Sequence, residues 1–225
     1  MKPKKKPTNR RLTVSFALAL VLALAALALL PGGLLQTTSA AGEVCEITDT
    51  GIMYFSLEDA LDDVPDGTPT TILMLSDHTE AGQIEIDNKQ ITIDIDGHAL
   101  EFADSLTIEN GSDVEFLGGT TVEVGQNIYI TNSSKAEFPG LVIGGNLFCD
   151  DSEAEVNGDI QSGYSNTIAA INNSAVTVFG NLDGYEPVYV VNSDVVIIGN
   201  ITIQNGNGVD ADNGSTVLVE GNISA

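Results

Sequence analysis

Basic residues are scarce in this chain beyond its first eleven positions. Six of the eight Lys and Arg residues lie between Lys2 and Arg11, and only Lys89 and Lys135 follow them. With 32 acidic residues against these two lysines, the 185 residues after Ala40 carry a formal charge of −30. Nucleic acids and anionic lipids need a positive surface, so this composition excludes them as partners. It suits an extracellular surface, or one that collects cations.

Long hydrophobic runs are absent except for one, which spans residues 12–30. It follows the basic opening residues and ends at Pro31-Gly32-Gly33, and Thr38-Ser39-Ala40 then resembles a cleavage site of small residues. We predict that residues 1–40 are a signal peptide, so that the protein is secreted or displayed at the cell surface without further membrane contact. The alternative is an uncleaved anchor, because roughly 20 apolar residues are enough to span a bilayer.

A short repeated phrase dominates the rest of the chain. It reads Ser, any residue, apolar, any residue, apolar, any residue, Gly. The six copies occupy residues 112–118, 134–140, 152–158, 174–180, 193–199 and 215–221. Their glycines lie 22, 18, 22, 19 and 22 residues apart. A period near 20 indicates stacked units, none of which can bury its apolar face alone.

The alternation within the phrase predicts a short strand with one buried face. An Asn or Asp shortly before each Ser marks a corner, because these residues tolerate left-handed backbone conformations. Two and four residues before that corner, all twelve positions are apolar, which predicts a second strand. These inward pairs are Leu106/Ile108, Ile128/Ile130, Leu147/Cys149, Ala169/Ile171, Val188/Val190 and Val209/Ala211. A third strand follows each Gly, as in residues 120–124 and 201–203.

Three short strands in each turn of about 20 residues, with no helix between them, predict an all-β fold, the single-stranded parallel β-helix. The uneven repeat length favours the right-handed, three-sheet type. We assign residues 68–225 to its turns. The chain stops just as a new turn begins, so we expect an open last turn that stacks on a further domain or continues in a longer protein.

Residues 41–67 are predicted to form an N-terminal cap. Two short strands, residues 44–48 and 52–55, precede a helix over residues 56–64. Ser56 is a suitable N-cap, and Pro65-Asp66-Gly67 ends the helix. Its apolar face comprises Leu57, Ala60, Leu61 and Val64. We expect this face to cover the end of the core and to hide the edge of the first turn.

The cap and the first turn resemble a known family. The segments are Ser56-Leu57-Glu58-Asp59-Ala60-Leu61, Asp66-Gly67, and the run from Ile91 to Leu100. They resemble secreted, pectin-lyase-like β-helix proteins of bacterial surfaces. That superfamily spans lyases, hydrolases, adhesins and structural stalks, so the resemblance implies the fold and leaves the activity open.

Catalytic features of the family are hard to find in this chain. The resemblance to pectate lyases implies acids that hold calcium beside an Arg or Lys, but no Arg follows residue 11 and the two lysines are far apart. Asp150-Asp151 offers an acid pair, yet Asp151 falls on a corner. We predict no catalytic residues and an exported stalk or adhesin module, whose partner is a glycan or a surface protein. The alternatives are a polysaccharide lyase or glycoside hydrolase of this superfamily, and a mechanical spacer.

The outward positions of the second strand offer a candidate glycan-binding face. Three residues before the corner stand Thr107, Tyr129, Phe148, Ala170, Tyr189 and Asp210, and one residue before it stand Glu109, Thr131, Asp150, Asn172, Val191 and Asp212. Aromatic rings beside polar groups suit sugar rings. We therefore predict ligand-binding roles for Tyr129, Phe148, Tyr189, Glu109 and Asp150. The alternative is that the aromatic residues only stabilise the sheet.

A column of acids on the strand within the phrase is a candidate metal site. Glu115, Glu137 and Glu155 occupy the same position in consecutive repeats. Hard cations take oxygen ligands, so calcium is the one ion that we expect, and we expect no other cofactor. The alternative is a solvated acidic face without a bound ion.

The two cysteines are predicted to remain free. Cys149 falls in the inward column, whereas Cys45 precedes the first turn. Turns stack at roughly 4.8 Å, so several turns separate the two residues. A disulfide needs Cα atoms within about 7 Å. We therefore expect no disulfide between them.

Overall fold

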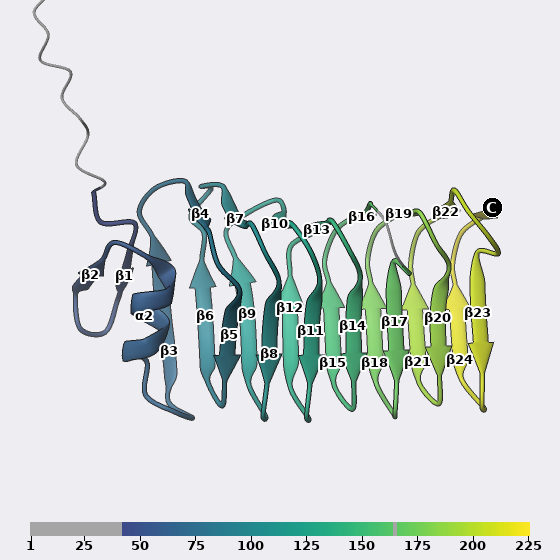
Figure 1. Ribbon diagram of the computed structural model, residues 1–225, viewed down its shortest axis with the longest axis horizontal. Helices are drawn as coiled ribbons and strands as arrows, with labels where there is room; N and C mark the ends of the chain where they lie inside the picture. Colours follow the sequence, from purple (N-terminus) through teal and green to yellow (C-terminus); the bar gives the residue numbers. More distant parts are fainter. Residues whose placement is uncertain (1–41, 164–165) are drawn as a thin grey trace, which may run out of the picture. The chain divides into compact units, whose positions relative to one another are not determined.

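A computed structural model of the chain describes residues 42–163 and 166–225. It confirms the predicted fold, since three sheets of short parallel strands wind along one axis as a β-helix (Figure 1). We name them sheets A, B and C. The predicted signal peptide lies outside the described residues.

Each turn contributes one strand to each sheet. Along sheet A lie β2 (Ile52–Tyr54), β1 (Cys45–Ile47), β3 (Pro69–Met74), β6 (Gln90–Asp94), β9 (Asp113–Leu117), β12 (Lys135–Phe138), β15 (Glu153–Val156), β18 (Ala175–Val178), β21 (Asp194–Ile197) and β24 (Thr216–Val219). Sheet B comprises β4 (His78–Glu80), β7 (Leu100–Phe102), β10 (Val122–Val124), β13 (Leu141–Ile143), β16 (Ile160–Ser162), β19 (Leu182–Gly184), β22 (Ile201–Ile203) and β25 (Ile223–Ser224). Sheet C comprises β5 (Ile84–Asp87), β8 (Leu106–Glu109), β11 (Ile128–Thr131), β14 (Leu147–Asp150), β17 (Ile168–Ile171), β20 (Val188–Val191) and β23 (Val209–Asp212).

The core is a column of inward side chains from all three sheets. Val176, Val195 and Val217 are Cα partners in successive turns, as the repeat predicts. In β9 and β12, near the middle of sheet A, Phe116 and Phe138 stack with ring centroids 5.0 Å apart. Because identical positions pair in register, each turn extends the same apolar stripe, and the alternation of the sequence becomes one continuous core.

The serine of each phrase forms a buried ladder. The Ser134 Oγ accepts a hydrogen bond from the Ser112 N–H, the Ser152 Oγ from the Ser134 N–H, and the Ser174 Oγ from the Ser152 N–H. Each hydroxyl thus satisfies a backbone donor of the preceding turn at a corner where the sheets cannot. The repeat identified these serines, but it did not predict this role.

The corner between sheets C and A also corrects part of the predicted register. Asn172 and Asn173 both have positive φ, so this corner holds one residue more than the corner at Asp151. Cys149 therefore pairs with Ala170, and Phe148 pairs with Ala169. The inward residues of β17 are Ile168 and Ala170, whereas we expected Ala169 and Ile171.

The N-terminal cap contains the predicted helix, α2 (Leu57–Asp63), and Ser56 accepts the Asp59 N–H at 3.1 Å. Leu57, Ala60 and Leu61 are buried against the end of the core. The edge of sheet A is covered differently from our expectation. The strand β1 pairs antiparallel with β3, so a hairpin of β1 and β2 protects that edge instead of the helix.

Both cysteines are free, as predicted, and both are buried, which was predicted for Cys149 alone. Burial raises the pKa of the Cys149 thiol to about 12. Burial and then the nearby Glu80 and Asp59 raise the pKa of Cys45 to about 12. Both side chains are therefore protonated at neutral pH and act as small hydrophobic groups.

The far end of the described β-helix is less buried than its middle. Val217 and Val219 are only partly buried against the core, and the Ile223 side chain is half exposed. In the described part of the chain, β23, β24 and β25 pair with a strand on one side only. Stacking of a further domain on these edges stays a prediction.

Candidate functional site

The outer face of sheet C carries two columns of outward residues in register. The first column is Glu85, Thr107, Tyr129, Phe148, Ala169, Tyr189 and Asp210. The second is Asp87, Glu109, Thr131, Asp150, Ile171, Val191 and Asp212. Acids lie at both ends of the face, and the aromatic and aliphatic residues lie in its middle together with Thr131 and Asp150.

The structure brings Tyr129 and Phe148 together, as predicted. Their ring centroids are 5.9 Å apart, and the planes cross at 62° in an edge-to-face contact. Tyr189 lies two turns further on and is 38% exposed. Ala169 lies between Phe148 and Tyr189 and is only 5% exposed, so its larger neighbours shield it. The predicted aromatic residues therefore form a pair and a separate third ring.

The register correction changes which residues lie beside these rings. Ala170 is fully buried, although we expected it on the outer face. Ile171 takes the outward position for which we expected Asn172. Together with Val191, it makes the middle of the face more apolar than the sequence indicated. A shift of one residue exchanges inward and outward side chains, because the period of a strand is two.

Polar contacts hold the side chains around the aromatic pair. The Asn127 amide donates to the Tyr129 hydroxyl at 3.0 Å, and the Asn172 amide donates to Asp150 at 2.7 Å. The pKa of Glu109 is raised by desolvation first and by the adjacent Glu85 and Asp87 carboxylates next. The strand register places Glu109 and Asp150 in the same outward column, with Thr131 between them.

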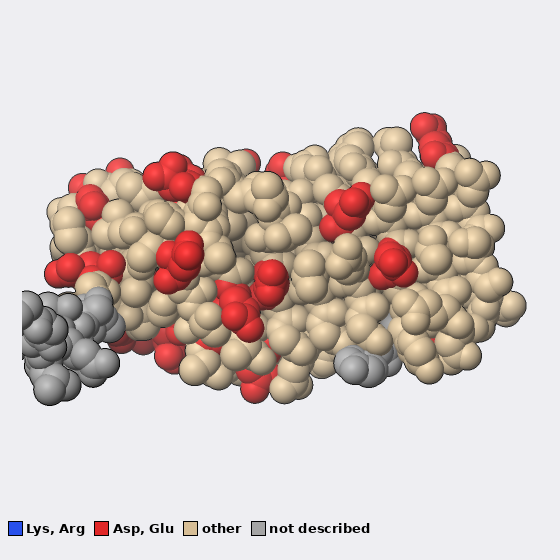
Figure 2. Space-filling view, turned by 90° about the horizontal axis from the view of Figure 1, so that it is seen from above, with Lys and Arg blue, Asp and Glu red and all other residues tan. Residues whose placement is uncertain are grey.

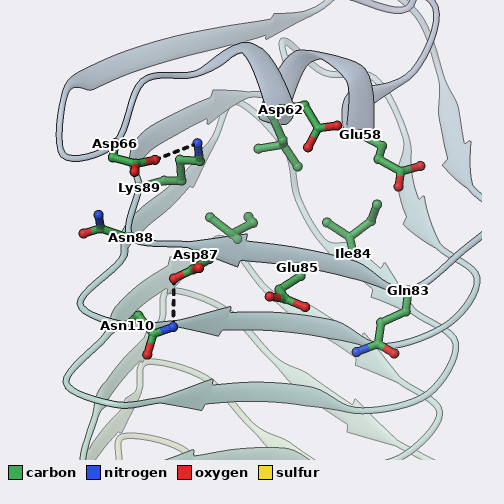
Figure 3. Close-up of a pocket in the computed structure, with 12 residues that line it drawn as sticks. Glu58, Asp62, Asp66, Gln83, Ile84, Glu85, Asp87, Asn88, Lys89 and Asn110 are labelled. Atoms are coloured by element: carbon green, nitrogen blue, oxygen red, sulfur yellow. Dashed lines mark hydrogen bonds and ion pairs between the residues drawn. The ribbon is translucent and has the colours of Figure 1, made fainter.

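A groove adjoins the acidic end of this face, between α2 and β5 (Figure 3). Its volume is about 710 Å³. Glu58 and Asp62 reach it from the helix, and Glu85 and Asp87 reach it from the strand. At one end, the Lys89 ammonium donates to Asp66 at 3.1 Å and to the Val64 carbonyl. This groove could not be predicted from the sequence, because the helix and the strand lie more than 20 residues apart.

The three glutamates of the predicted metal column are in register, but two of them accept hydrogen bonds from other side chains. Glu115, Glu137 and Glu155 are Cα partners in consecutive turns of sheet A. The Asn157 amide donates to Glu137 at 2.7 Å, and the Thr92 hydroxyl donates to Glu115 at 3.5 Å. Within residues 42–163 and 166–225, no group of three His, Cys, Asp or Glu side chains has the geometry of a metal site. Calcium binding here stays a prediction.

Replacing the central glutamate of this column tests whether the three carboxylates bind calcium or only repel one another. Without calcium, we expect Glu137→Gln to raise the free energy of unfolding by about 0.5 kcal/mol, because it removes repulsion from both neighbours. The amide oxygen still accepts from Asn157. Thermal unfolding with and without millimolar calcium measures this. A bound ion would instead make calcium stabilise the wild type and not the variant.

The residues considered for catalysis do not converge. Lys89 contacts the cap, whereas Lys135 lies in β12 beside Asp113 and Glu153. Asp151 has φ of 50° and is a corner residue, as predicted. Of the two histidines, His78 pairs with Glu80 and His98 with Asp77. Both histidines border one hollow of about 370 Å³ at sheet B, whereas Lys89, Lys135 and Asp151 lie away from it.

Nearly all charged side chains after residue 11 are acidic. Figure 2 shows them scattered over one side of the molecule, mostly toward its N-terminal half, with no basic side chain in view. This distribution agrees with the composition, because only two lysines follow residue 11. Among the described residues, no helix is long and apolar enough to cross a membrane.

Comparison of the chain with protein-family models, with curated proteins and with solved structures gave no match.

Proposed function

We propose that this chain is an exported, non-catalytic β-helix module of the pectin-lyase-like type, a stalk or adhesin whose sheet C face contacts carbohydrate. The observation that carries the proposal is the outward Tyr129–Phe148 pair, with ring centroids 5.9 Å apart, in the middle of that face. A sugar ring buries its apolar side on an aromatic ring, and its hydroxyl groups need polar partners at the rim.

The groups around the pair supply such partners. Thr107 precedes Tyr129 in its column, and Thr131 and Asp150 lie beside the two rings. The Asn127 contact holds the Tyr129 hydroxyl in place before any ligand arrives. A strand surface of this kind is pre-organised, so little conformational entropy is lost when a ligand binds.

Truncation of the aromatic pair tests the proposal. We expect the double variant Tyr129→Ala, Phe148→Ala to lose binding to those glycans that the wild type retains on a glycan array. We expect Kd to rise at least about tenfold, because each truncation removes apolar area that the bound sugar would otherwise bury. Far-UV circular dichroism should remain unchanged.

The matched control is Phe179→Ala, which removes an aromatic ring that is 46% exposed and lies directly after β18 of sheet A. This variant is expected to bind like the wild type. Unchanged binding by a folded double variant would rule out the sheet C face. Release of oligosaccharides from a polysaccharide by the wild type would instead favour the lyase or hydrolase alternative.

A further inference from the structure

Within residues 42–163 and 166–225, the outer edge of β5 has no strand partner. Sheet C ends at this strand, which pairs only with β8. The Ile84 and Asn88 N–H groups point toward β8, where they donate to the Ser105 and Glu109 carbonyls. Because backbone groups alternate along a strand, those of Glu85 and Asp87 point the other way, into the groove beside α2.

The other two sheets end differently at this end of the described chain. The strand β1 pairs with β3 of sheet A, and β2 protects β1 in turn. At sheet B, β4 pairs only with β7, and its Glu80 carboxylate accepts the Leu57 and Glu58 N–H groups at the start of α2. The edge of sheet C faces a hollow of about 710 Å³. An unpaired edge beside open space is a template for an added strand.

The charges around this edge define what can occupy it. Glu58 and Asp62 line one wall, and Glu85 and Asp87 line the other. The nearest basic group, Lys89, is already paired with Asp66. Leu61, Ile84 and Ile86 also border the groove, but they are buried in the core, so the surface open to a ligand is mainly polar. A segment that fits must therefore be extended and positively charged.

We propose that the groove between α2 and β5 binds an extended, lysine- or arginine-bearing segment of a partner protein, which pairs with the free edge of β5. Its backbone meets the N–H and carbonyl groups of Glu85 and Asp87. Its basic side chains reach the carboxylates of both walls. This binding is separate from the proposed carbohydrate contact, which involves residues further along the sheet.

A blocked peptide of seven residues with alternating lysine and threonine is a suitable probe. We expect it to bind the chain from Ala41 onward, which contains the whole described core. Raising the salt concentration should weaken binding, because the contact charges are exposed. The same peptide with alternate backbone nitrogens methylated keeps its charge but cannot pair as a strand. We expect this analogue to bind at least about tenfold more weakly.

Glu85→Pro tests the strand edge from the side of the protein. Proline removes the outward N–H and is tolerated where that group makes no bond within the sheet. The preceding residue, Ile84, already has the extended conformation that a following proline requires. We expect peptide binding to fall at least about tenfold. The double variant Glu153→Gln, Asp194→Asn removes exposed acids from sheet A instead and should bind the peptide like the wild type.

Comparison of peptide binding among these variants tests strand addition at β5. Preferential binding of the unmethylated peptide, lost in Glu85→Pro and kept in the sheet A variant, supports strand addition. Equal binding of both peptides would show attraction by charge alone and would overturn it, even if Glu85→Pro failed to fold. The Tyr129→Ala, Phe148→Ala variant should retain peptide binding, so failure of the carbohydrate proposal and failure of this one are distinguishable.

Discussion

Gly180→Ala is expected to lower the free energy of unfolding by about 3 kcal/mol, because two turns of the β-helix touch at this glycine. A Cβ atom at position 180 would lie 2.3 Å from the Gly158 carbonyl oxygen and 2.4 Å from its carbon. Both are backbone atoms, so no flexible side chain can move away. The turns would have to separate, and that would strain the strand pairing on both sides.

The contact at Gly180 belongs to a series. A Cβ atom at Gly199 would meet the Gly180 oxygen at 2.1 Å, and one at Gly158 would meet the Pro139 oxygen at 2.3 Å. These glycines serve close approach rather than a left-handed turn. Gly118 differs from them, because it has φ of 73° as well as close neighbours. The structure thus assigns close approach to most glycines of the repeat.

Gly82→Ala is the matched control for this prediction. Nothing lies within 4 Å of a Cβ atom at position 82, and its backbone conformation is ordinary. The same substitution there should leave stability unchanged or raise it slightly, since alanine restricts the unfolded chain. Urea unfolding of the two variants measures the difference. Equal midpoints would contradict the packing argument for Gly180.

Glu80→Ala is expected to detach the N-terminal cap and to lower the free energy of unfolding of that region by about 3 kcal/mol. The carboxylate is 6% exposed and accepts the Leu57 and Glu58 N–H groups at the start of α2. It also contacts the His78 Nε2 at 2.8 Å. Its removal leaves buried donors without partners and withdraws a negative charge from the positive end of the helix.

Hydrogen exchange resolves the effect on the cap from that on the whole molecule. We expect the α2 amides to exchange faster in Glu80→Ala, while the amides of β12 to β21 keep their protection. Glu80→Gln should have a smaller effect, because its amide oxygen still accepts the helix N–H groups. Glu123→Ala removes an exposed acid from the same sheet and should change nothing. Unaltered exchange in Glu80→Ala would show that α2 is held by its apolar face alone.

The parts of the fold that depend on neighbours in the chain could be predicted. Alternating apolar residues dictate a strand with one buried face, as in Val176 and Val178. An Asn with φ near 55°, such as Asn110 or Asn192, turns the chain at a corner because its side chain tolerates that conformation. Ser56 begins a helix because its side chain satisfies a free N–H. These preferences act over a few residues, so they can be recognised without knowledge of the rest of the fold.

Other features depend on residues brought together from different turns. The register at Ala169 and Ala170 was wrong because Asn172 and Asn173 both suit a corner, and only pairing with β14 shows that both belong to it. The partner of each ladder serine lies 18 to 22 residues away, as at Ser134 and Ser152. Glu80 acquires its role from a helix that begins 23 residues earlier.

The sequence by itself thus determined the β-helix, its corners and its cap, because each follows from local conformational preference repeated at a regular period. The tertiary structure decided which edges of the sheets are covered, which outward residues share a face, and that a groove lies beside β5. Stacking sets these features, since a backbone edge or an outward column exists only once distant turns lie side by side.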